Sequence, residues 1–438
     1  MRQLSFPAAM AARICRWLAN NRPFALFLGT YGVLALAVAL RAPFPNHYDE
    51  LAHLSYIAHI AQFGAPPVGA RDMFLLAPEL SRWFTSVPNY LNHPAAYYRV
   101  LSLLLPADGW PTRDTVTVLR LANVTLSILA VACALRLAPR KDADSQILIV
   151  YRAAVVFVPM LALLGGAITN DNLALLGGCA CVWGARILSA ARSDRIGRFL
   201  LLAGCVLAAL AKLTAAMMTG LFVLAFLVTP AGRPSTASDW RFIGWLIGAV
   251  ALASLPYAQA LLAVGSPAPR SPAFDAVYRH HADYHTYLWG WTPDVPLSVF
   301  SYARHFTVWL YRNWNPSNNM PGWRDVAALV GGTAILLLAV PTFVANSPIW
   351  RASHPVAGAA GVAMAATFVG HLAFSYHMHR LTGSPPFDAV PRYYFPLALA
   401  AVPEAACVTL AMLPAGIRGM LLAPLTLALA AAFLALGF

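Results

Sequence analysis

The chain has 438 residues, of which 59% are hydrophobic and only 11% are charged, and its formal net charge is +13. Soluble domains carry about 25% charged residues, so this chain lacks the charge needed to cover soluble surfaces. The composition excludes a soluble enzyme, a disordered protein and a secreted disulfide scaffold. With a mean hydropathy of +0.63, it predicts a single polytopic, all-α transmembrane domain over residues 1–438.

Arginine supplies nearly all of the positive charge, because Lys141 and Lys212 are the only lysines. Most of the arginines lie in short segments between apolar runs rather than in one basic patch. This pattern is typical of helix ends that face an anionic cytoplasmic leaflet. It therefore disfavours a nucleic-acid partner.

Apolar runs long enough to cross a bilayer predict about eleven transmembrane helices. Nine of the runs lie at about residues 24–42, 116–138, 147–166, 173–190, 242–262, 326–345, 355–377, 393–413 and 419–437. The remaining run, residues 199–228, would span about 45 Å as one helix, which exceeds a hydrocarbon core of about 30 Å. A single helix would also bury the ammonium group of Lys212 near the bilayer centre, at about 3 kcal/mol or more. We therefore favour two short helices that meet near Lys212, with one long helix as the alternative.

The two-helix topology predicts the orientation in the membrane. It places basic residues at about three times the density on one side as on the other. The positive-inside rule then puts the N-terminus in the cytoplasm and the loops 43–115 and 263–325 outside. The outer segments also carry 12 of the 17 acidic residues. One long helix over 199–228 would instead place the second loop inside.

The first outer loop opens with FPNHYDELAHLSYIAHIAQFG, in which apolar residues recur at helical spacing between Pro45 and Gly64. The pattern predicts a short amphipathic helix at the membrane interface. Asp49 and Glu50 fall in its first turn, where the helix dipole favours anions. An N-terminal capping pair is the ordinary interpretation, and a general base held at the membrane surface is the alternative. His53 follows one turn later and shares a face with Asp49.

The same loop continues with LNHPAAYYRVLSLLLP, which contains His93. Pro94 suits the first turn of a second short interfacial or re-entrant helix. Tyr97 and Tyr98 would either stack against a sugar or belong to the aromatic belt of the membrane protein.

Two histidine and cysteine patterns bear on metal binding. The second outer loop holds a histidine cluster (280, 281 and 285), so a divalent metal there is conceivable. Cys179 and Cys181 lie within an apolar run and lack zinc-site spacing. We therefore predict no cofactor and assign no metal ligands.

Three further polar groups fall at the outer ends of predicted spans. Asn170 and Asp171 lie in ITNDNLALLGG, where a helix cap is the ordinary interpretation. Lys212 joins the two short helices, and a lone intramembrane lysine is rare and usually functional. Arg392 and Tyr393 open the tenth span, as either an interfacial anchor or a functional pair. The topology places all of them on the same membrane face as the first-loop acids, which suits chemistry on an anionic amphiphile.

A glycosyl transfer can be built from these residues. The donor would be a sugar on a polyprenyl phosphate, with its lipid tail in the bilayer. Asp49 would take the proton of an acceptor hydroxyl as it attacks the anomeric carbon. Lys212 and Arg392 would neutralise the departing lipid phosphate. We predict Asp49 and Glu50 as catalytic, and as substrate-binding residues His53, His93, Tyr97, Tyr98, Asn170, Asp171, Lys212, Arg392 and Tyr393.

The segments HYDELAHLSYI, HPAAYY, LRLANVTLSI, ITNDNLALL, LAALAKLTA and PRYYFPLALA occur in this order between residues 47 and 400. Together they resemble bacterial integral-membrane glycosyltransferases of the GT-C class, which includes protein O-mannosyltransferases and lipid A aminoarabinose transferases. The sequence is most similar to a bacterial family of predicted membrane proteins of unassigned function. The resemblance implies a GT-C-like fold, a polyprenyl-phosphate-sugar donor, and a catalytic acid at Asp49 with Glu50 beside it. It also implies that Lys212 and Arg392 act near the lipid phosphate.

The predicted partners are this donor, membrane lipid and a glycan, lipid or protein acceptor of the cell envelope. Two other functions stay open. A transporter or flippase for a lipid-linked or anionic substrate would use Lys212, Arg152 and Glu404 to line a path, although no internal repeat is visible and the outer loops are long. A non-catalytic partner in envelope polysaccharide assembly is the third possibility.

Overall fold

The computed structural model describes residues 21–45, 49–64, 73–91, 93–138, 145–264, 296–312, 333–340 and 355–434, together with positions 276 and 279. The first helices and strands in chain order are α2 (Arg22–Arg41), α3 (Glu50–Phe63), β1 (Phe74–Leu76), β2 (Phe84–Pro88), α4 (Ala96–Ser102), α5 (Arg113–Leu135), α6 (Ser145–Val156), α7 (Pro159–Gly165) and α8 (Asp171–Ala190). The later ones are α9 (Arg195–Ala211), α10 (Leu213–Leu227), α11 (Ala237–Ala253), α12 (Leu255–Val264), α14 (Val299–Arg312), α17 (Pro355–Thr382), the 3₁₀ turn η1 (Pro391–Tyr393), α18 (Phe395–Met412) and α19 (Ala415–Leu434).

The protein is an all-α, multi-pass membrane protein, as predicted. Five helices of the described part are long and apolar enough to cross a bilayer: α2, α5, α8, α17 and α18. The pair α11 and α12 passes the same test when taken together, with a bend of 46° between its halves. The predicted span 147–166 is divided into α6 and α7, and most of the predicted span 326–345 lies outside the described residues. The number of eleven spans therefore stays a prediction.

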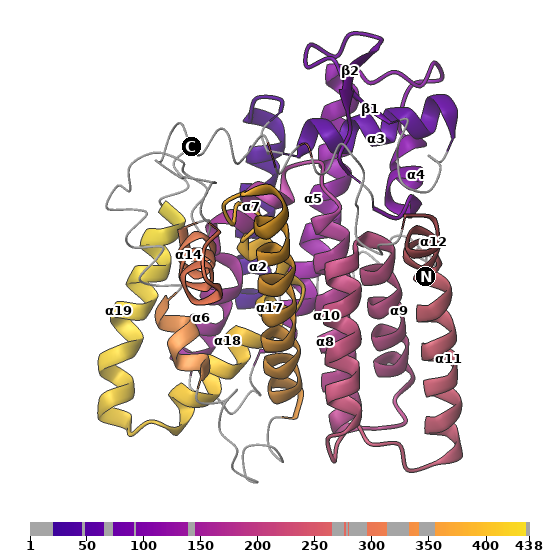
Figure 1. The fold of residues 1–438 in the computed structure, drawn as a ribbon. Coiled ribbons are helices and arrows are strands. Elements are labelled where there is room, and N and C mark those ends of the chain that lie inside the picture. The colour runs from indigo at the N-terminus through magenta and orange to yellow at the C-terminus, as the bar shows by residue number, and fades with distance from the viewer. Residues whose placement is uncertain are drawn as a thin grey trace, which may run out of the picture.

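Residues 199–228 form two helices that meet at Lys212, whose extended backbone ends α9 and begins α10. Contacts at the far ends of this pair show that it is a hairpin. The Arg198 guanidinium, near the start of α9, donates at 2.7 Å to the carboxylate of Asp239 in the first turn of α11, the helix that follows α10. The chain therefore reverses at Lys212, and the turn between α9 and α10 lies at one end of the helix bundle rather than in its middle (Figure 1).

The elements of the first loop, α3, α4 and the β1–β2 hairpin, gather at one end of the bundle (Figure 1). The sequence predicts one solvated face for α3, but the structure buries nearly every residue from Ala52 to Ile60. The loop itself covers the polar face. Ser55 accepts a hydrogen bond from the backbone of Leu76 on β1 at 2.8 Å, and Asn89 donates to the carbonyl of Ala52 at 2.8 Å. The hairpin is a structure that the sequence pattern did not predict.

The second predicted loop contains α14, a helix that the sequence analysis did not assign. Tyr302 of α14 is fully buried, and its hydroxyl lies 2.6 Å from that of Ser375 on α17. The histidine cluster of this loop lies outside the described residues. The boundaries of both loops relative to the membrane remain predictions.

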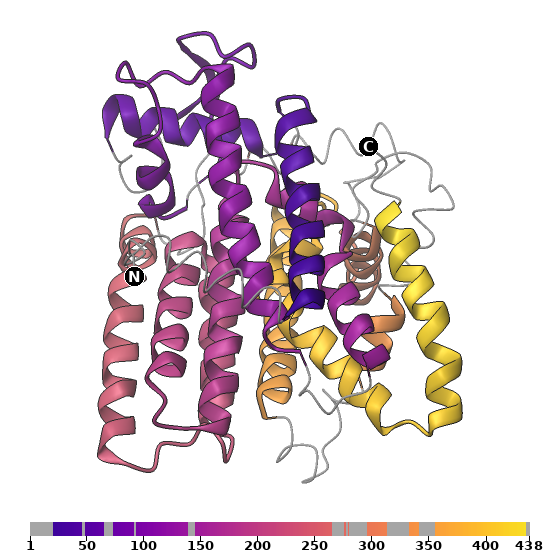
Figure 2. The same cartoon turned by 180° about the vertical axis from the view of Figure 1, so that it is seen from behind.

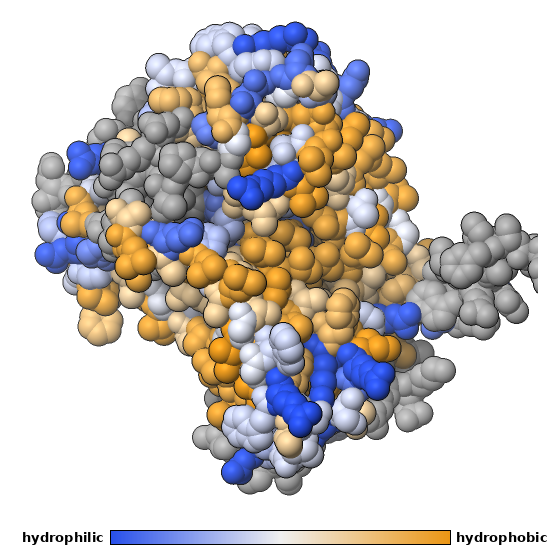
Figure 3. Space-filling model, turned by 90° about the vertical axis from the view of Figure 1, so that its right-hand side faces the viewer, coloured by the Kyte–Doolittle hydropathy of each residue, from blue (hydrophilic) through white to orange (hydrophobic). Residues whose placement is uncertain are grey.

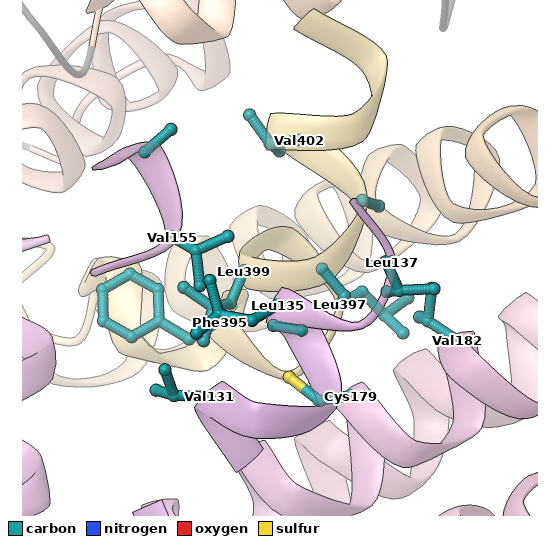
Figure 4. Close-up of a cluster of buried hydrophobic side chains, with 14 of the residues drawn as sticks. Val131, Leu135, Leu137, Val155, Cys179, Val182, Phe395, Leu397, Leu399 and Val402 are labelled. Carbon is teal, nitrogen blue, oxygen red and sulfur yellow. The ribbon is translucent and has the colours of Figure 1, made fainter. Parts of the chain in front are cut away.

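Helix α8 is the centre of the bundle and packs against α5, α9 and α18, while α2 packs beside α5 on the far side (Figure 2). Small residues allow close contact with α9: a Cβ added to Gly177 would lie 2.6 Å from the backbone nitrogen of Ala208, and one added to Gly204 would lie 2.5 Å from that of Cys181. Figure 4 shows the apolar core around α8, with side chains from α5, α6 and α18 converging on Cys179 and Val182. These contacts fix the end of α8 that carries Asp171.

The outer surface matches a bilayer environment. On the side of the molecule seen in Figure 3, hydrophobic side chains form a broad middle zone, and hydrophilic ones gather at the top and bottom. Large apolar side chains are exposed on α11 and α12, including Trp245, which is 75% exposed, and Leu262, which is 87% exposed. Such a surface suits contact with lipid tails.

The close contact of Gly178 with α18 can be tested by substitution. A Cβ at this position would clash with the backbone carbonyl of Pro396. We expect Gly178→Ala to lower the free energy of unfolding by about 1–3 kcal/mol, because overpacking forces the helices apart. Gly248→Ala on α11 is the matched control, since its Cβ would meet nothing within 4 Å and alanine favours the helix. Thermal unfolding in detergent checks both variants, and equal melting temperatures would contradict the packing described here.

Candidate active site

Four segments that are far apart in the sequence meet at the end of the bundle covered by the first loop. They are the start of α3, the start of α8, the turn between α9 and α10, and η1 before α18. Each contributes one charged side chain at a helix boundary: Asp49, Asp171, Lys212 and Arg392 respectively. The structure therefore brings together four of the residues singled out from sequence.

These side chains form a continuous chain of ion pairs. A terminal nitrogen of Arg392 donates to Asp49 at 2.5 Å, and its Nε lies 3.6 Å from Asp171. The other carboxylate oxygen of Asp171 pairs with the ammonium group of Lys212. Asp49 and Arg392 are the more accessible members, with side-chain exposures of 17% and 12%, against 8% for Asp171 and 4% for Lys212.

The ring of Tyr393 lies beneath both cations. The Lys212 ammonium is 4.6 Å from the ring centroid, and the Arg392 guanidinium carbon is 5.5 Å from it. Cation–π contacts of this kind stabilise positive charge and strengthen in desolvated sites. Burial raises the pKa of Tyr393 to about 12, although Arg392 acts to lower it, so the ring carries no charge at neutral pH.

The capping interpretation does not describe how the polar side chains at these helix starts are used. Asp49 is the N-cap residue of α3 but makes no side-chain capping bond. Asn170 likewise does not cap α8 with its side chain, and it donates instead to the carbonyl of Ala211 at 2.8 Å. That bond ties the start of α8 to the turn that carries Lys212. Both side chains thus bond to other segments of the charged site instead of capping their own helices.

Glu50 has surroundings quite different from those of Asp49. It is fully buried, and both of its carboxylate oxygens accept hydrogen bonds from Arg120 of α5 at 2.8 Å. The backbone of Ile168 donates to the same carboxylate at 3.1 Å. Arg120 also donates to backbone carbonyls that end α2, including that of Ala42 at 2.8 Å. Arg120 was not among the residues predicted from the sequence, although a charged residue inside a predicted transmembrane span often has a functional or structural role.

Aromatic and imidazole side chains line the side of the site formed by the first loop. Tyr90, which sequence reasoning missed, donates its hydroxyl to Asp49 at 2.5 Å. His53 Nδ1 lies 2.9 Å from the Tyr98 hydroxyl, and its ring stacks with that of His93 at a centroid distance of 6.3 Å. The predicted sugar-stacking residue Tyr98 is itself stacked on Tyr56 at 3.9 Å.

Tyr97 points towards the helix bundle. Its hydroxyl donates to Asn123 of α5 at 2.8 Å, and Asn172 of α8 donates to the same oxygen at 3.0 Å. Tyr97 therefore links the first loop to α5 and α8.

The protonation of the loop residues follows from burial. Burial and the positive charge of Lys212 lower the pKa of His93 to about 4, although Asp171 and Asp49 act to raise it. Burial and the carboxylate of Asp49 raise the pKa of Tyr90 well above its ordinary value. At neutral pH the site therefore contains a neutral His93 and a Tyr90 hydroxyl that keeps its proton. Within the part of the chain that the structure describes, no cluster of three or more His, Cys, Asp or Glu side chains could hold a metal ion.

Comparison with solved structures finds a similar fold in ArnT from Cupriavidus metallidurans. In its crystal structure bound to undecaprenyl phosphate, the match covers 92% of this chain and 63% of the ArnT chain, with a TM-score of 0.51 and 16% sequence identity. In the apo structure the match covers 92% of this chain and 62% of that chain, with a TM-score of 0.48 and 16% identity. This chain has a GT-C-like membrane fold. It spans less than two thirds of the length of ArnT.

No protein-family model and no curated protein sequence matches the chain. The predicted similarity to a bacterial family of unassigned function therefore stays a prediction. The GT-C-like fold agrees with the fold expected from the ordered sequence segments, and it places the ion-pair chain at one end of the transmembrane bundle.

The Glu50–Arg120 pair predicts a strong effect on stability. We expect Glu50→Gln to lower the free energy of unfolding by about 3–5 kcal/mol, because it leaves the Arg120 guanidinium buried without a counter-charge. Asp108→Asn is the control, since it breaks an exposed ion pair with Arg82 in the same loop, a change of about 1 kcal/mol or less. Thermal unfolding of the purified variants measures the difference. A Glu50→Gln variant as stable as Asp108→Asn would contradict the structural role of this pair.

The lowered pKa of His93 predicts a pH dependence of stability. Between about pH 6.5 and pH 4 the unfolded chain binds a proton that the folded chain does not, so the free energy of unfolding falls as the pH falls through this window. His93→Gln should remove this part of the pH dependence. Melting temperatures at about pH 7 and about pH 5 test it, with exposed His377→Gln as the control. An unchanged pH dependence in His93→Gln would show that His93 is not buried as a neutral group.

Proposed function

We propose that this protein is a membrane glycosyltransferase that transfers a sugar from a polyprenyl-phosphate donor to a cell-envelope acceptor. The observation that carries the proposal is the ion-pair chain, in which the partly exposed carboxylate of Asp49 meets the partly exposed Arg392 and the buried Lys212 at the end of a transmembrane bundle. The fold likeness to ArnT, which was crystallised with undecaprenyl phosphate, supports a lipid phosphate as the ligand of those cations. The sugar and the acceptor are not specified by these residues.

The proposed reaction uses the residues in the roles that their charges allow. The acceptor hydroxyl attacks the anomeric carbon of the donor, and its proton passes to a carboxylate oxygen of Asp49. The bond between the anomeric carbon and the phosphate oxygen breaks at the same time. Lys212 and Arg392 stabilise the negative charge that remains on the lipid phosphate. Arg392 suits this role because its planar guanidinium binds phosphate oxygens in pairs.

Before the donor binds, both oxygens of Asp49 are engaged, one by Arg392 and the other by Tyr90. A donor phosphate would compete with Asp49 for the Arg392 guanidinium. Its arrival would release one carboxylate oxygen to accept a proton, while Tyr90 keeps the carboxylate oriented. Donor binding and activation of the base are coupled in this proposal.

We assign Glu50 a positioning role. Its pair with Arg120 anchors the first turn of α3, and Glu50 is adjacent in the sequence to Asp49, the proposed base. His93 and Tyr393 remain proposed substrate contacts, His93 as a neutral hydrogen-bonding group and Tyr393 as the ring beneath the cations. The surroundings of His53, Tyr97 and Tyr98 favour a supporting role. His53 and Tyr98 are bonded or stacked within the loop, and Tyr97 is bonded to Asn123 of α5.

The transporter alternative would need ionisable side chains to share a path. In the structure Glu404 contacts Arg186 at 3.5 Å, and Lys212 contacts Asp171. These residues therefore belong to separate ion pairs. The outcome that would favour transport is movement of a labelled sugar lipid across a vesicle without formation of a new glycosidic bond.

Asp49→Asn separates the two parts of the proposed mechanism. We expect it to reduce sugar transfer by about 100-fold or more, because an amide cannot take the acceptor proton. We also expect it to retain or tighten binding of undecaprenyl phosphate, because the carboxylate that competes with the phosphate for Arg392 is removed. Lys212→Met should instead weaken that binding. Mass spectrometry of envelope glycans, from cells lacking the gene and complemented with each variant, measures transfer, and native mass spectrometry measures binding.

The control for Asp49→Asn is Asp108→Asn, which removes an exposed carboxylate of the same loop. Tyr90→Phe adds an intermediate test, because it deletes a single hydrogen bond to Asp49 and should slow transfer without abolishing it. Full transfer by a folded Asp49→Asn protein would exclude Asp49 as the base. Undecaprenyl phosphate binding that is indifferent to Lys212→Met would exclude the proposed phosphate site.

A further inference from the structure

A basic surface lies at the far end of the bundle from the ion-pair chain. It is formed by two loops, each taken with the first turn of the helix that follows it: residues 191–198 between α8 and α9, and residues 230–241 between α10 and α11. Helix α8 has 20 residues between Asp171 and this surface, and it spans about 30 Å at 1.5 Å per residue. That length equals the thickness of a hydrocarbon core. The basic surface therefore lies at the headgroup level of the opposite leaflet.

The charges of this surface are unbalanced. The two loops contain five arginines and two aspartates, and both aspartates are engaged locally. Asp194 accepts a hydrogen bond from the backbone of Gly197 at 2.8 Å and caps α9, and Asp239 pairs with Arg198. The exposed Arg192 donates to the hydroxyl of Ser235 and to the carbonyl of Pro230, which carry no charge.

Two of the arginines share a cavity. Arg192 and Arg233 line a surface cavity of about 330 Å³ between the loops, together with Val228, Pro230, Pro234 and Ser235. A narrower extension between the same two arginines is lined by apolar side chains that include Phe226, Leu227 and Phe242, and by the paired Arg198 and Asp239. Among the described residues of these loops, Arg198 is the arginine paired with a carboxylate. The cavity thus offers two guanidinium groups beside apolar side chains.

We propose that this cavity binds the phosphate headgroup of an anionic phospholipid. Two guanidinium groups suit a phosphate, which accepts several charge-assisted hydrogen bonds, and basic pockets between helix ends bind anionic lipid headgroups. The surrounding surface favours a lipid over a soluble phosphate. Phe199, which is 67% exposed, follows Arg198 on α9, and Trp240, which is 62% exposed, follows Asp239 on α11. Exposed aromatic side chains of this kind suit acyl chains and a membrane interface.

The bound headgroup would act on the α9–α10 hairpin. Arg192 precedes α9 and Arg233 follows α10, so a phosphate bridging them holds the open end of the hairpin together. The closed end of the same hairpin carries Lys212. An anionic lipid at this site therefore stabilises the element that positions Lys212, without contacting the ion-pair chain.

The test compares two double variants of the full-length protein that remove the same charge. Arg192→Gln with Arg233→Gln alters the cavity, and Arg195→Gln with Arg241→Gln alters exposed arginines of the same two loops that do not line it. Each protein is purified in detergent with phosphatidylglycerol or phosphatidylcholine, and its melting temperature and lipid adducts are measured by thermal unfolding and native mass spectrometry. Because the two lipids are compared within one variant, any effect of the substitutions on the stability of the protein itself cancels from the difference in melting temperature.

We expect phosphatidylglycerol to raise the melting temperature of the wild type and of the control variant equally. The cavity variant should lose most of that rise and bind phosphatidylglycerol about 30-fold more weakly. If the double variant does not fold, Arg233→Gln alone should show a partial loss. Equal losses in both double variants would overturn the proposal in favour of general attraction to the leaflet. An equal rise with soluble glycerol phosphate would overturn the assignment to a lipid.

Discussion

The need to pair charges at the membrane boundary is the constraint on which this structure depends. An isolated ammonium or carboxylate in a low-dielectric environment is unstable by several kcal/mol, and this is offset only when a partner and further hydrogen bonds are present. Lys212 is buried at the turn of an apolar hairpin, so it requires Asp171. Asp171 is shared with Arg392, which in turn holds Asp49. Because these residues come from α8, the hairpin, η1 and the first loop, pairing their charges also fixes the relative positions of those elements.

The adjacent acids Asp49 and Glu50 have different roles. Asp49 is the N-cap residue and Glu50 the first residue of α3, and their side chains contact different partners. Glu50 points to α5 and joins Arg120 in a fully buried pair that also holds the end of α2. Asp49 points along the surface of the bundle to Arg392. The loop is thus anchored by one acid, and the neighbouring acid stays partly accessible for the proposed chemistry.

Physical limits visible in the sequence predicted much of this arrangement. The break at Lys212 follows from the length of the run 199–228 against the thickness of a bilayer, and the positions of Asp49, Lys212 and Arg392 on one face follow from counting spans. What escaped prediction depends on contacts between distant segments. Tyr90 reaches Asp49 across 41 residues, and Arg120 reaches Glu50 across 70. No local periodicity encodes such pairs, and the burial of α3 on its polar face likewise depends on the β1–β2 hairpin folding over it.

The balance of charge in the ion-pair chain links its structure to the proposed reaction. Two carboxylates and two cations cancel, so the resting site is neutral without a ligand. A lipid phosphate that enters this site adds negative charge next to Asp49 and draws Arg392 away from it. Both effects disfavour the ionised carboxylate and favour its protonation. In the proposed mechanism the proton that satisfies Asp49 comes from the acceptor hydroxyl, so the base is strongest when the donor is in place. When the free lipid phosphate departs, Arg392 returns to Asp49, which releases the proton and restores the neutral chain.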